Sequence, residues 1–163
     1  MSAPLFRAAI ITFAALFATS TAIAANSNKP PAAKQDPVQK PHRVVIQVDQ
    51  NDPAVMNLAL NNASNVIDYY RSKKQDVSVD IVTYGPGLHM LRADTSPVKD
   101  RVARLKEYAF PSTIQFSACN NTRQNMEKSE GHPIEVVKEA SIVPSGVVHA
   151  MELQEQGWSY LRP

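Results

Sequence analysis

The chain has 163 residues and a nearly balanced charge, with 17 Lys and Arg residues, 15 Asp and Glu residues and a formal net charge of +2. Acidic and basic residues are interspersed, and the lack of a basic run or stripe disfavours nucleic acid as a partner. The single cysteine, Cys119, excludes an internal disulfide framework.

The first 25 residues have the three-part pattern of a secretory signal peptide. Arg7 supplies a positive charge, residues 8–23 are almost entirely apolar or small, and Ala24 and Ala25 precede a polar segment. The pattern predicts cleavage after one of these two alanines and a periplasmic location. A retained membrane anchor is the alternative, but the apolar run falls short of the ~20 residues that span a bilayer.

Residues 26–41 form a proline-rich stretch without aromatic residues. Such a composition buries too little apolar surface to offset the entropy of ordering, so it predicts a flexible tether. Residues 42–163 are then close to the commonest size of one domain and can bury one core.

The first half of this domain predicts a strand, a helix and a second strand. The β-branched run Arg43–Asp49 is too short for a helix and predicts a buried strand. Asp52 and Pro53 match a helix start, and apolar residues at steps of three and four extend that helix to about Lys74. The segment Val77–Thr83 predicts the second strand.

The second half of the domain continues the alternation of helices and strands. A helix that starts at Ser96-Pro97 is followed by a strand over Thr113–Ala118 and by a short helix from the cap residues Asn120-Asn121-Thr122 through Lys128. A strand over Ser141–Pro144 comes next, and then a helix over Val147–Gln156 that Ser145 caps and Gly157 ends. The last predicted strand covers Trp158–Leu161.

This alternation predicts an α/β fold with a mostly parallel five-stranded sheet and helices on both of its faces. Ligands of such sheets bind outside the carboxyl ends of the strands. The segments expected at that edge are Asp49–Asp52, Tyr84–His89, Cys119–Thr122 and Ser145–His149.

Cys119 is the strongest candidate for chemistry. It lies between a predicted strand end and a predicted helix start, where backbone amides and the positive end of the helix dipole would stabilise a thiolate. The alternative is a packed thiol, because free cysteine is among the most commonly buried residues.

The histidines offer weaker candidates. His89 and His149 fall in segments at the same edge as Cys119, so either could act as its base in a thiol-dependent hydrolase. The remaining histidines, His42 and His132, are distant in sequence and show no paired spacing, so no metal site is predicted.

The sequence does not favour a cofactor. Gly85-Pro86-Gly87 is a weak match to a phosphate-binding turn because Met90 occupies the place of the third glycine, and a tight turn that lets backbones approach is the simpler interpretation. The first loop, Asp49–Asp52, carries two carboxylates that would repel the phosphate of a flavin. We therefore expect no cofactor.

Three ordered segments resemble the DsrE/DsrF-like (YchN-like) family, in particular its small exported members. They are YGPGLHML at 84–91, FSACNNT at 116–122 and the closing stretch PSGVVHAMELQEQGWSYLRP at 144–163. The resemblance implies a flavodoxin-like three-layer α/β/α fold, assembly as a trimer or hexamer, and a persulfide on Cys119 that passes sulfur to a partner protein. Asn120-Asn121-Thr122 departs from the small, basic stretch of the relay subunits, and export departs from their cytoplasmic location.

Two main functions follow as expectations. The first is a sulfur carrier or thiol-redox protein with Cys119 as its reactive residue. The alternative is a non-enzymatic ligand-binding or assembly module in which Cys119 is structural, and the thiol-dependent hydrolase comes third. The residues expected to contact a substrate are Asn120, Asn121, Thr122, Gly85, Gly87, His89, Ser145 and Gly146.

Overall fold

The computed structural model describes residues 41–163, so the predicted signal peptide and nearly all of the predicted tether lie outside the described residues. The elements in chain order are β1 (His42–Val48), α1 (Pro53–Ser72), β2 (Val77–Thr83), the 3₁₀ helix η1 (Gly85–Leu91), α2 (Lys99–Tyr108), β3 (Thr113–Cys119), α3 (Asn120–Glu130), β4 (Ala140–Val143), α4 (Gly146–Glu155) and β5 (Ser159–Leu161).

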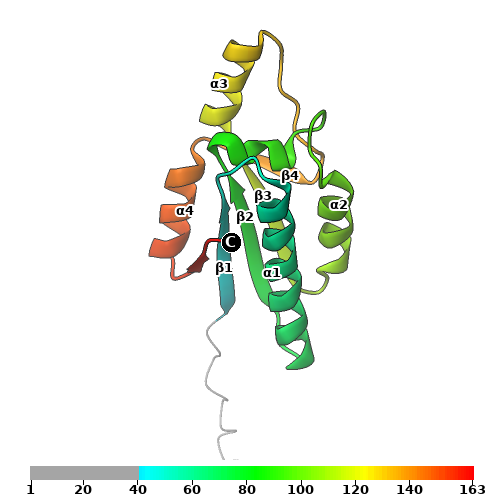
Figure 1. The fold of residues 1–163 in the computed structure, drawn as a ribbon. Coiled ribbons are helices and arrows are strands. Elements are labelled where there is room, and N and C mark those ends of the chain that lie inside the picture. Colours follow the sequence, from blue (N-terminus) through cyan, green and yellow to red (C-terminus); the bar gives the residue numbers. More distant parts are fainter. Residues whose placement is uncertain (1–40) are drawn as a thin grey trace, which may run out of the picture. The chain divides into compact units, whose positions relative to one another are not determined.

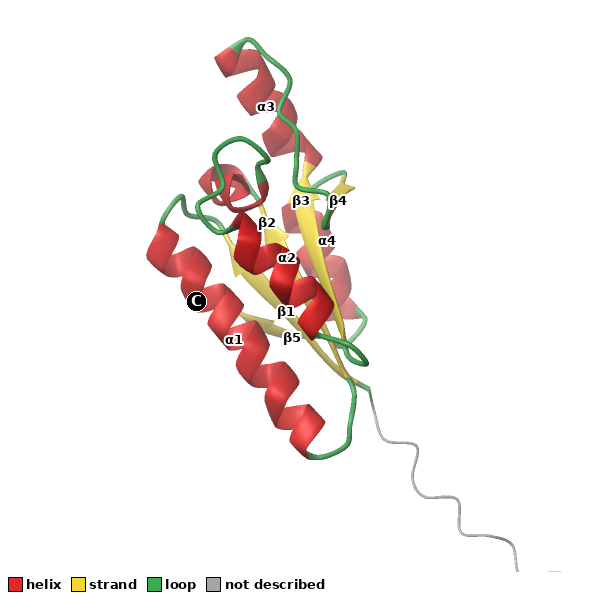
Figure 2. Ribbon diagram, turned by 90° about the vertical axis from the view of Figure 1, so that its right-hand side faces the viewer, coloured by secondary structure: helices red, strands yellow, loops and turns green. Residues whose placement is uncertain are grey.

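The five strands form one sheet in the order β4-β3-β2-β1-β5, and all neighbouring strands are parallel. Helices α1 and α2 cover one face, and α4 covers the opposite face (Figures 1 and 2). This is the three-layer α/β/α arrangement of flavodoxin-like folds, which confirms the predicted fold class. The pairing of Val48 with Thr83, and of Thr83 with Ala118, brings the carboxyl ends of the three central strands to one edge.

Successive side chains of each strand point to opposite faces of the sheet. On β1, Val44, Ile46 and Val48 belong to the large apolar cluster under α1 and α2. Val45 faces the other way and packs with Val82, Ala150 and Leu153 in a much smaller cluster under α4.

Side-chain caps mark the starts of two helices, α1 and α4. The Asp52 carboxylate caps α1 by accepting a hydrogen bond from the amide of Ala54 at 2.7 Å, as predicted. Ser145 caps α4 in the same way through the amide of Val148 at 3.5 Å. The helix expected from Ser96 instead begins at Lys99, because the Ser96 hydroxyl accepts from the amide of Val98 and forms a turn first.

Two further boundaries differ from expectation. The segment expected to be a plain turn after β2 continues as η1, whose Gly87 packs directly on β1. A Cβ atom at Gly87 would lie only 2.1 Å from the carbonyl oxygen of Val48, which confirms that this glycine serves a close backbone approach. The cap of α3 is Cys119 itself, so the two asparagines and Thr122 lie in the first turn.

Helix α3 projects beyond the carboxyl edge of the sheet (Figure 1) and contains no buried residue. A guanidinium group anchors its far end. Arg92, of whose side chain 2% is exposed, bonds both carboxylate oxygens of Glu130 at 2.6 and 2.8 Å and both oxygens of Asp94 at 2.7 and 2.9 Å. Within residues 41–163, no helix combines the length and the apolar character that crossing a membrane requires.

Candidate functional site

Cys119 ends β3 and caps α3, so its thiol lies at the carboxyl edge of the sheet, where the sequence predicted it. Only 4% of the residue is exposed. The thiol is therefore shielded, and its chemistry depends on the groups that surround it inside the protein.

Those groups are hydrogen-bond donors. Burial, the largest single influence, raises the pKa of the Cys119 thiol, but hydrogen bonds from the Thr122 hydroxyl and from the amides of Gly146, Thr122 and Asn121 together outweigh it, and the net pKa is lowered. Because thiolate is the reactive form of cysteine, this environment favours nucleophilic chemistry.

Thr122 connects the thiol to the segment after β2. Its Oγ1 accepts a hydrogen bond from the amide of Gly85 at 2.9 Å. The hydroxyl proton is then available for the sulfur of Cys119, and a chain of hydrogen bonds runs from the start of η1 through the first turn of α3 to the thiol.

Gly146, the first residue of α4, packs against the other side of the thiol. A Cβ atom at this position would lie 3.1 Å from the Cβ atoms of both Cys119 and Tyr84. Glycine thus lets the start of α4 approach the end of β3 closely. The Ser145 cap orients this first turn, so that the Gly146 amide reaches the sulfur.

A cavity of about 400 Å³ opens beside this site at the same edge. It includes three of the predicted contact residues, Gly85, His89 and Thr122. Its full lining is Asn51, Gly85, Pro86, His89, Thr122, Asn125, Met126 and Ser129. Apolar atoms form most of the cavity wall, with side-chain amides, hydroxyls and one imidazole among them. Thr122 belongs both to the cavity and to the environment of the thiol.

The other predicted contact residues have structural partners. Asn120 accepts hydrogen bonds from Arg123 at 3.0 and 3.1 Å through its side-chain oxygen. The amide of Asn121 donates to the carbonyl of Pro144 as well as to the thiol. Gly87 lies against β1 and does not line the cavity.

The two histidines considered as bases make other contacts. Nε2 of His149 lies 2.9 Å from a carboxylate oxygen of Asp80 and 3.4 Å from the hydroxyl of Ser117. Nδ1 of His89 lies 3.0 Å from the hydroxyl of Thr95. These contacts direct the two rings toward groups other than Cys119 and give a Cys/His dyad no geometric support.

Sequence reasoning missed the partners of His149. Asp80 is 3% exposed and Ser117 is fully buried, and the Ser117 hydroxyl donates to the carboxylate of Asp80 at 2.8 Å. The signal was present in the sequence, because a carboxylate in the middle of the otherwise β-branched run Val77–Thr83 requires partners.

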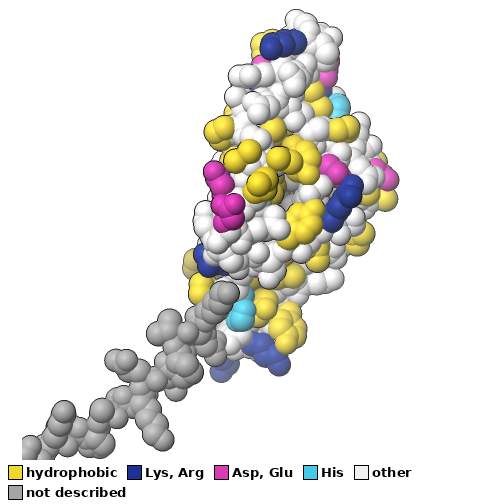
Figure 3. Space-filling model, turned by 90° about the vertical axis from the view of Figure 1, so that its left-hand side faces the viewer, with side chains coloured by type: hydrophobic (Ala, Val, Ile, Leu, Met, Phe, Trp, Pro, Cys, Tyr) yellow, Lys and Arg dark blue, Asp and Glu magenta, His cyan; other side chains and the backbone are white. Residues whose placement is uncertain are grey.

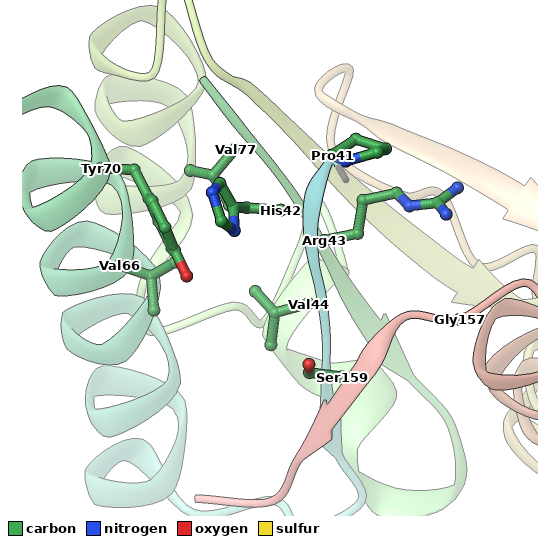
Figure 4. A pocket seen from close by; sticks show the side chains of 9 residues that line it. All are labelled: Pro41, His42, Arg43, Val44, Val66, Tyr70, Val77, Gly157 and Ser159. Carbon is green, nitrogen blue, oxygen red and sulfur yellow. The ribbon is translucent and has the colours of Figure 1, made fainter. Parts of the chain in front are cut away.

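A second cavity of about 400 Å³ lies at the amino ends of the strands, away from Cys119. Figure 4 shows His42 stacked on Tyr70 at one side and Ser159 of β5 at the other, with the Arg43 side chain directed away from the space between them. Among residues 41–163, no group of three or more His, Cys, Asp or Glu side chains is placed to hold a metal ion.

The fold is similar to the solved structure of a protein of unknown function from Methanobacterium thermoautotrophicum. The TM-score is 0.61 at 28% sequence identity, and the match covers 75% of this chain and 99% of the other. No family model matches the chain, and no curated protein does. The chain therefore has the α/β fold of that protein, and the resemblance to the DsrE/DsrF-like family stays a prediction.

Proposed function

We propose that this protein is an exported sulfur carrier that holds sulfur as a persulfide on Cys119. The observation that carries the proposal is the set of donors on the thiol: one hydroxyl and three backbone amides, which together lower its pKa despite burial. A thiol that was merely packed would have its pKa raised by the same burial.

The transfer needs no external oxidant or reductant. The Cys119 thiolate attacks the outer sulfur of a donor such as thiosulfate or a small persulfide, forms a new S–S bond and breaks the donor's S–S bond. Sulfite or a thiolate leaves with the electron pair. An acceptor nucleophile then attacks the outer sulfur of the Cys119 persulfide and releases the original thiolate.

The shape of the site favours small donors. Cys119 is 4% exposed, so a small sulfur compound reaches it more readily than a loop of another protein does. The neighbouring cavity provides a place for such a compound, since Thr122 both lines this cavity and donates a hydrogen bond to the sulfur.

Intact-mass spectrometry of the folded protein after incubation with thiosulfate or polysulfide tests the proposal. We expect the gain of one sulfur atom, reversed by reductant and lost in Cys119→Ser. The matched control is Ser141→Cys in the Cys119→Ser background, which places a thiol on the exposed surface of β4 without these donors. If Cys119 reacts only after unfolding, or no faster than the control thiol, the carrier function is wrong.

A second function is favoured by the outer surface of α4. Hydrophobic side chains gather over the face of the molecule on which this helix lies (Figure 3), and Val147, Val148 and Met151 are 47%, 47% and 55% exposed. Such a patch is typical of a contact with another subunit. If the protein is an assembly module in which Cys119 is structural, light scattering should detect a concentration-dependent oligomer. Met151→Lys should dissociate this oligomer, and the Cys119 thiol of the native protein should be inert.

A further inference from the structure

A buried polar cluster joins α4 to the sheet. Asp80 of β2, Ser117 of β3 and His149 of α4 meet between the two layers, with Asp80 accepting from the Ser117 hydroxyl at 2.8 Å and lying 2.9 Å from Nε2 of His149. The side chains of Asp80 and His149 are 4% and 22% exposed. No step of the proposed sulfur transfer uses these three residues.

The cluster is not arranged as a nucleophilic triad. In such a triad the two ring nitrogens of histidine serve two different partners, the nucleophile and the carboxylate. Here the same nitrogen, Nε2, faces both Asp80 and Ser117, and the Ser117 hydroxyl is fully buried and donates to the carboxylate. Ser117 is consequently a poor nucleophile, and the cluster holds structure in place.

What it holds in place is the start of α4. His149 lies one turn after Gly146, whose amide donates to the Cys119 thiol. The apolar contacts of this helix with the sheet come from Ala150 and Leu153, and contacts of this kind are non-directional and permit small displacements. The hydrogen bond between His149 and Asp80 is directional, so it fixes where the helix sits along the sheet.

We infer that His149 and Asp80 are positioning residues for the reactive thiol, because their pairing fixes the first turn of α4 and thereby holds the Gly146 amide against Cys119. This inference rests on the thiolate role of Cys119 proposed above. Loss of the pairing is expected to weaken the stabilisation of the thiolate while leaving Cys119 and its own contacts to α3 unchanged.

The surroundings of the pair support this role. Besides His149, the Asp80 carboxylate faces the Ser117 hydroxyl and the positive charge of Lys106 of α2. The side-chain amide of Gln115 in turn donates to the Ser117 hydroxyl at 3.4 Å. Burial raises the pKa of the Asp80 carboxyl, and the hydrogen bonds from His149 and Ser117 offset only part of that effect. A group that is costly to bury contributes little net stability, which favours a positioning role.

The test is the pH dependence of iodoacetamide alkylation of the single thiol in the full chain. The midpoint of the rate profile reports the thiol pKa, and its plateau reports access to the sulfur. His149→Ala is expected to raise the midpoint by about one pH unit. The alkylation rate at pH 7, expressed as a fraction of each protein's own plateau, should then be up to about tenfold lower in the variant than in the wild type. His149→Gln, which keeps a donor for Asp80, should show a smaller shift. Glu152→Ala, an exposed change one turn further along α4, should show none.

The outcomes separate this inference from the proposed function. A low midpoint in the wild-type protein that His149→Ala leaves unchanged would overturn the positioning role alone, as would equal shifts in His149→Ala and His149→Gln. If the midpoint of the wild-type profile equals the pKa of an ordinary thiol, both the positioning role of His149 and the proposed carrier function are wrong. If His149→Ala does not fold, Asp80→Asn with His149→Ala removes the unpaired buried charge, and the same shift is expected.

Discussion

The amide of Gly85 donates a hydrogen bond to the hydroxyl oxygen of Thr122 at 2.9 Å. The two residues are 37 positions apart in sequence, on the segments that follow β2 and β3. With its oxygen occupied by this donor, the hydroxyl directs its proton to Cys119, and it is the foremost donor that lowers the pKa of the thiol. The relationship gives η1 a direct influence on the chemistry of the site.

Thr122→Val, which keeps the shape of the side chain but removes the hydroxyl, is therefore expected to raise the pKa of Cys119. One hydrogen bond to a charged group corresponds to about one pKa unit. The pH profile of thiol alkylation measures the shift, and Thr122→Ser, which keeps the hydroxyl, serves as the control. Equal profiles for the two variants would rule out the hydroxyl as a donor to sulfur.

Gly87→Ala is expected to destabilise the domain by about 3 kcal/mol or more, because the new Cβ would lie 2.1 Å from the Val48 carbonyl oxygen and force the backbones apart. Gly131→Ala is the comparison, since its Cβ would meet nothing within 4 Å and only its φ of +75° is unfavourable. That strain costs about 1–2 kcal/mol. Urea denaturation measures both, and a smaller loss for Gly87→Ala than for Gly131→Ala would contradict the close packing of η1 on β1.

We expect the buried carboxyl of Asp80 to contribute less to the free energy of unfolding as pH rises, which is the opposite of what an acidic group with a lowered pKa does. Its pKa in the folded protein is raised above the 3.8 of the unfolded chain, chiefly by burial, so the folded state binds more protons between the two values. Its contribution to stability is therefore greatest at or below pH 3.8 and falls as pH rises through the folded pKa.

Asp80→Asn should remove that decline. The difference in unfolding free energy between Asp80→Asn and wild type is expected to shift in favour of the variant as pH rises from 3.5 toward 6, in a series of urea titrations. Asp76→Asn, on the loop before β2, is the control. A difference that stays constant with pH would show that burial does not perturb this carboxyl.

The ion pairs of Arg92 should make the folded domain less stable in acid. Its guanidinium lowers the pKa values of Asp94 and Glu130, so these carboxylates contribute stability above their unfolded values of 3.8 and 4.5, and that contribution is lost as pH falls through their lower folded values. Arg92→Met should remove this acid dependence and lower stability at pH 7 by about 1–3 kcal/mol. Arg104→Met, at an exposed position of α2, is the control in urea titrations at pH 7 and pH 3. An unchanged acid dependence in Arg92→Met would contradict the prediction.

The fold was largely predictable because its signals are local. The β-branched run Val77–Thr83 is β2 with the predicted bounds, and Asp52-Pro53 begins α1 as expected. The segment after β2 was harder, since Gly85 and Gly87 indicate an interruption without specifying a 3₁₀ helix, whose formation depends on the packing of Gly87 against β1.

The site was predictable only in part. The position of Cys119 follows from the order of elements, because a residue between a parallel strand and a helix falls at the carboxyl edge. The pairing of Asp80 with His149 joins residues 69 positions apart, and it depends on α4 crossing the sheet, which no local pattern encodes. The anchoring of α3 by Arg92 likewise joins segments that only the tertiary fold brings together.

The two faces of the sheet differ greatly in the apolar contacts that hold their helices. The buried cluster between α4 and the sheet has four hydrophobic residues, two from the helix and two from the strands. Helices α1 and α2 share the large cluster on the other side of the sheet. Partial opening in which α4 lifts away from the remaining layers thus requires less free energy than global unfolding. Amide exchange should be faster in α4 than in α1, and each such opening would also separate the amide of Gly146 from the enclosed sulfur atom.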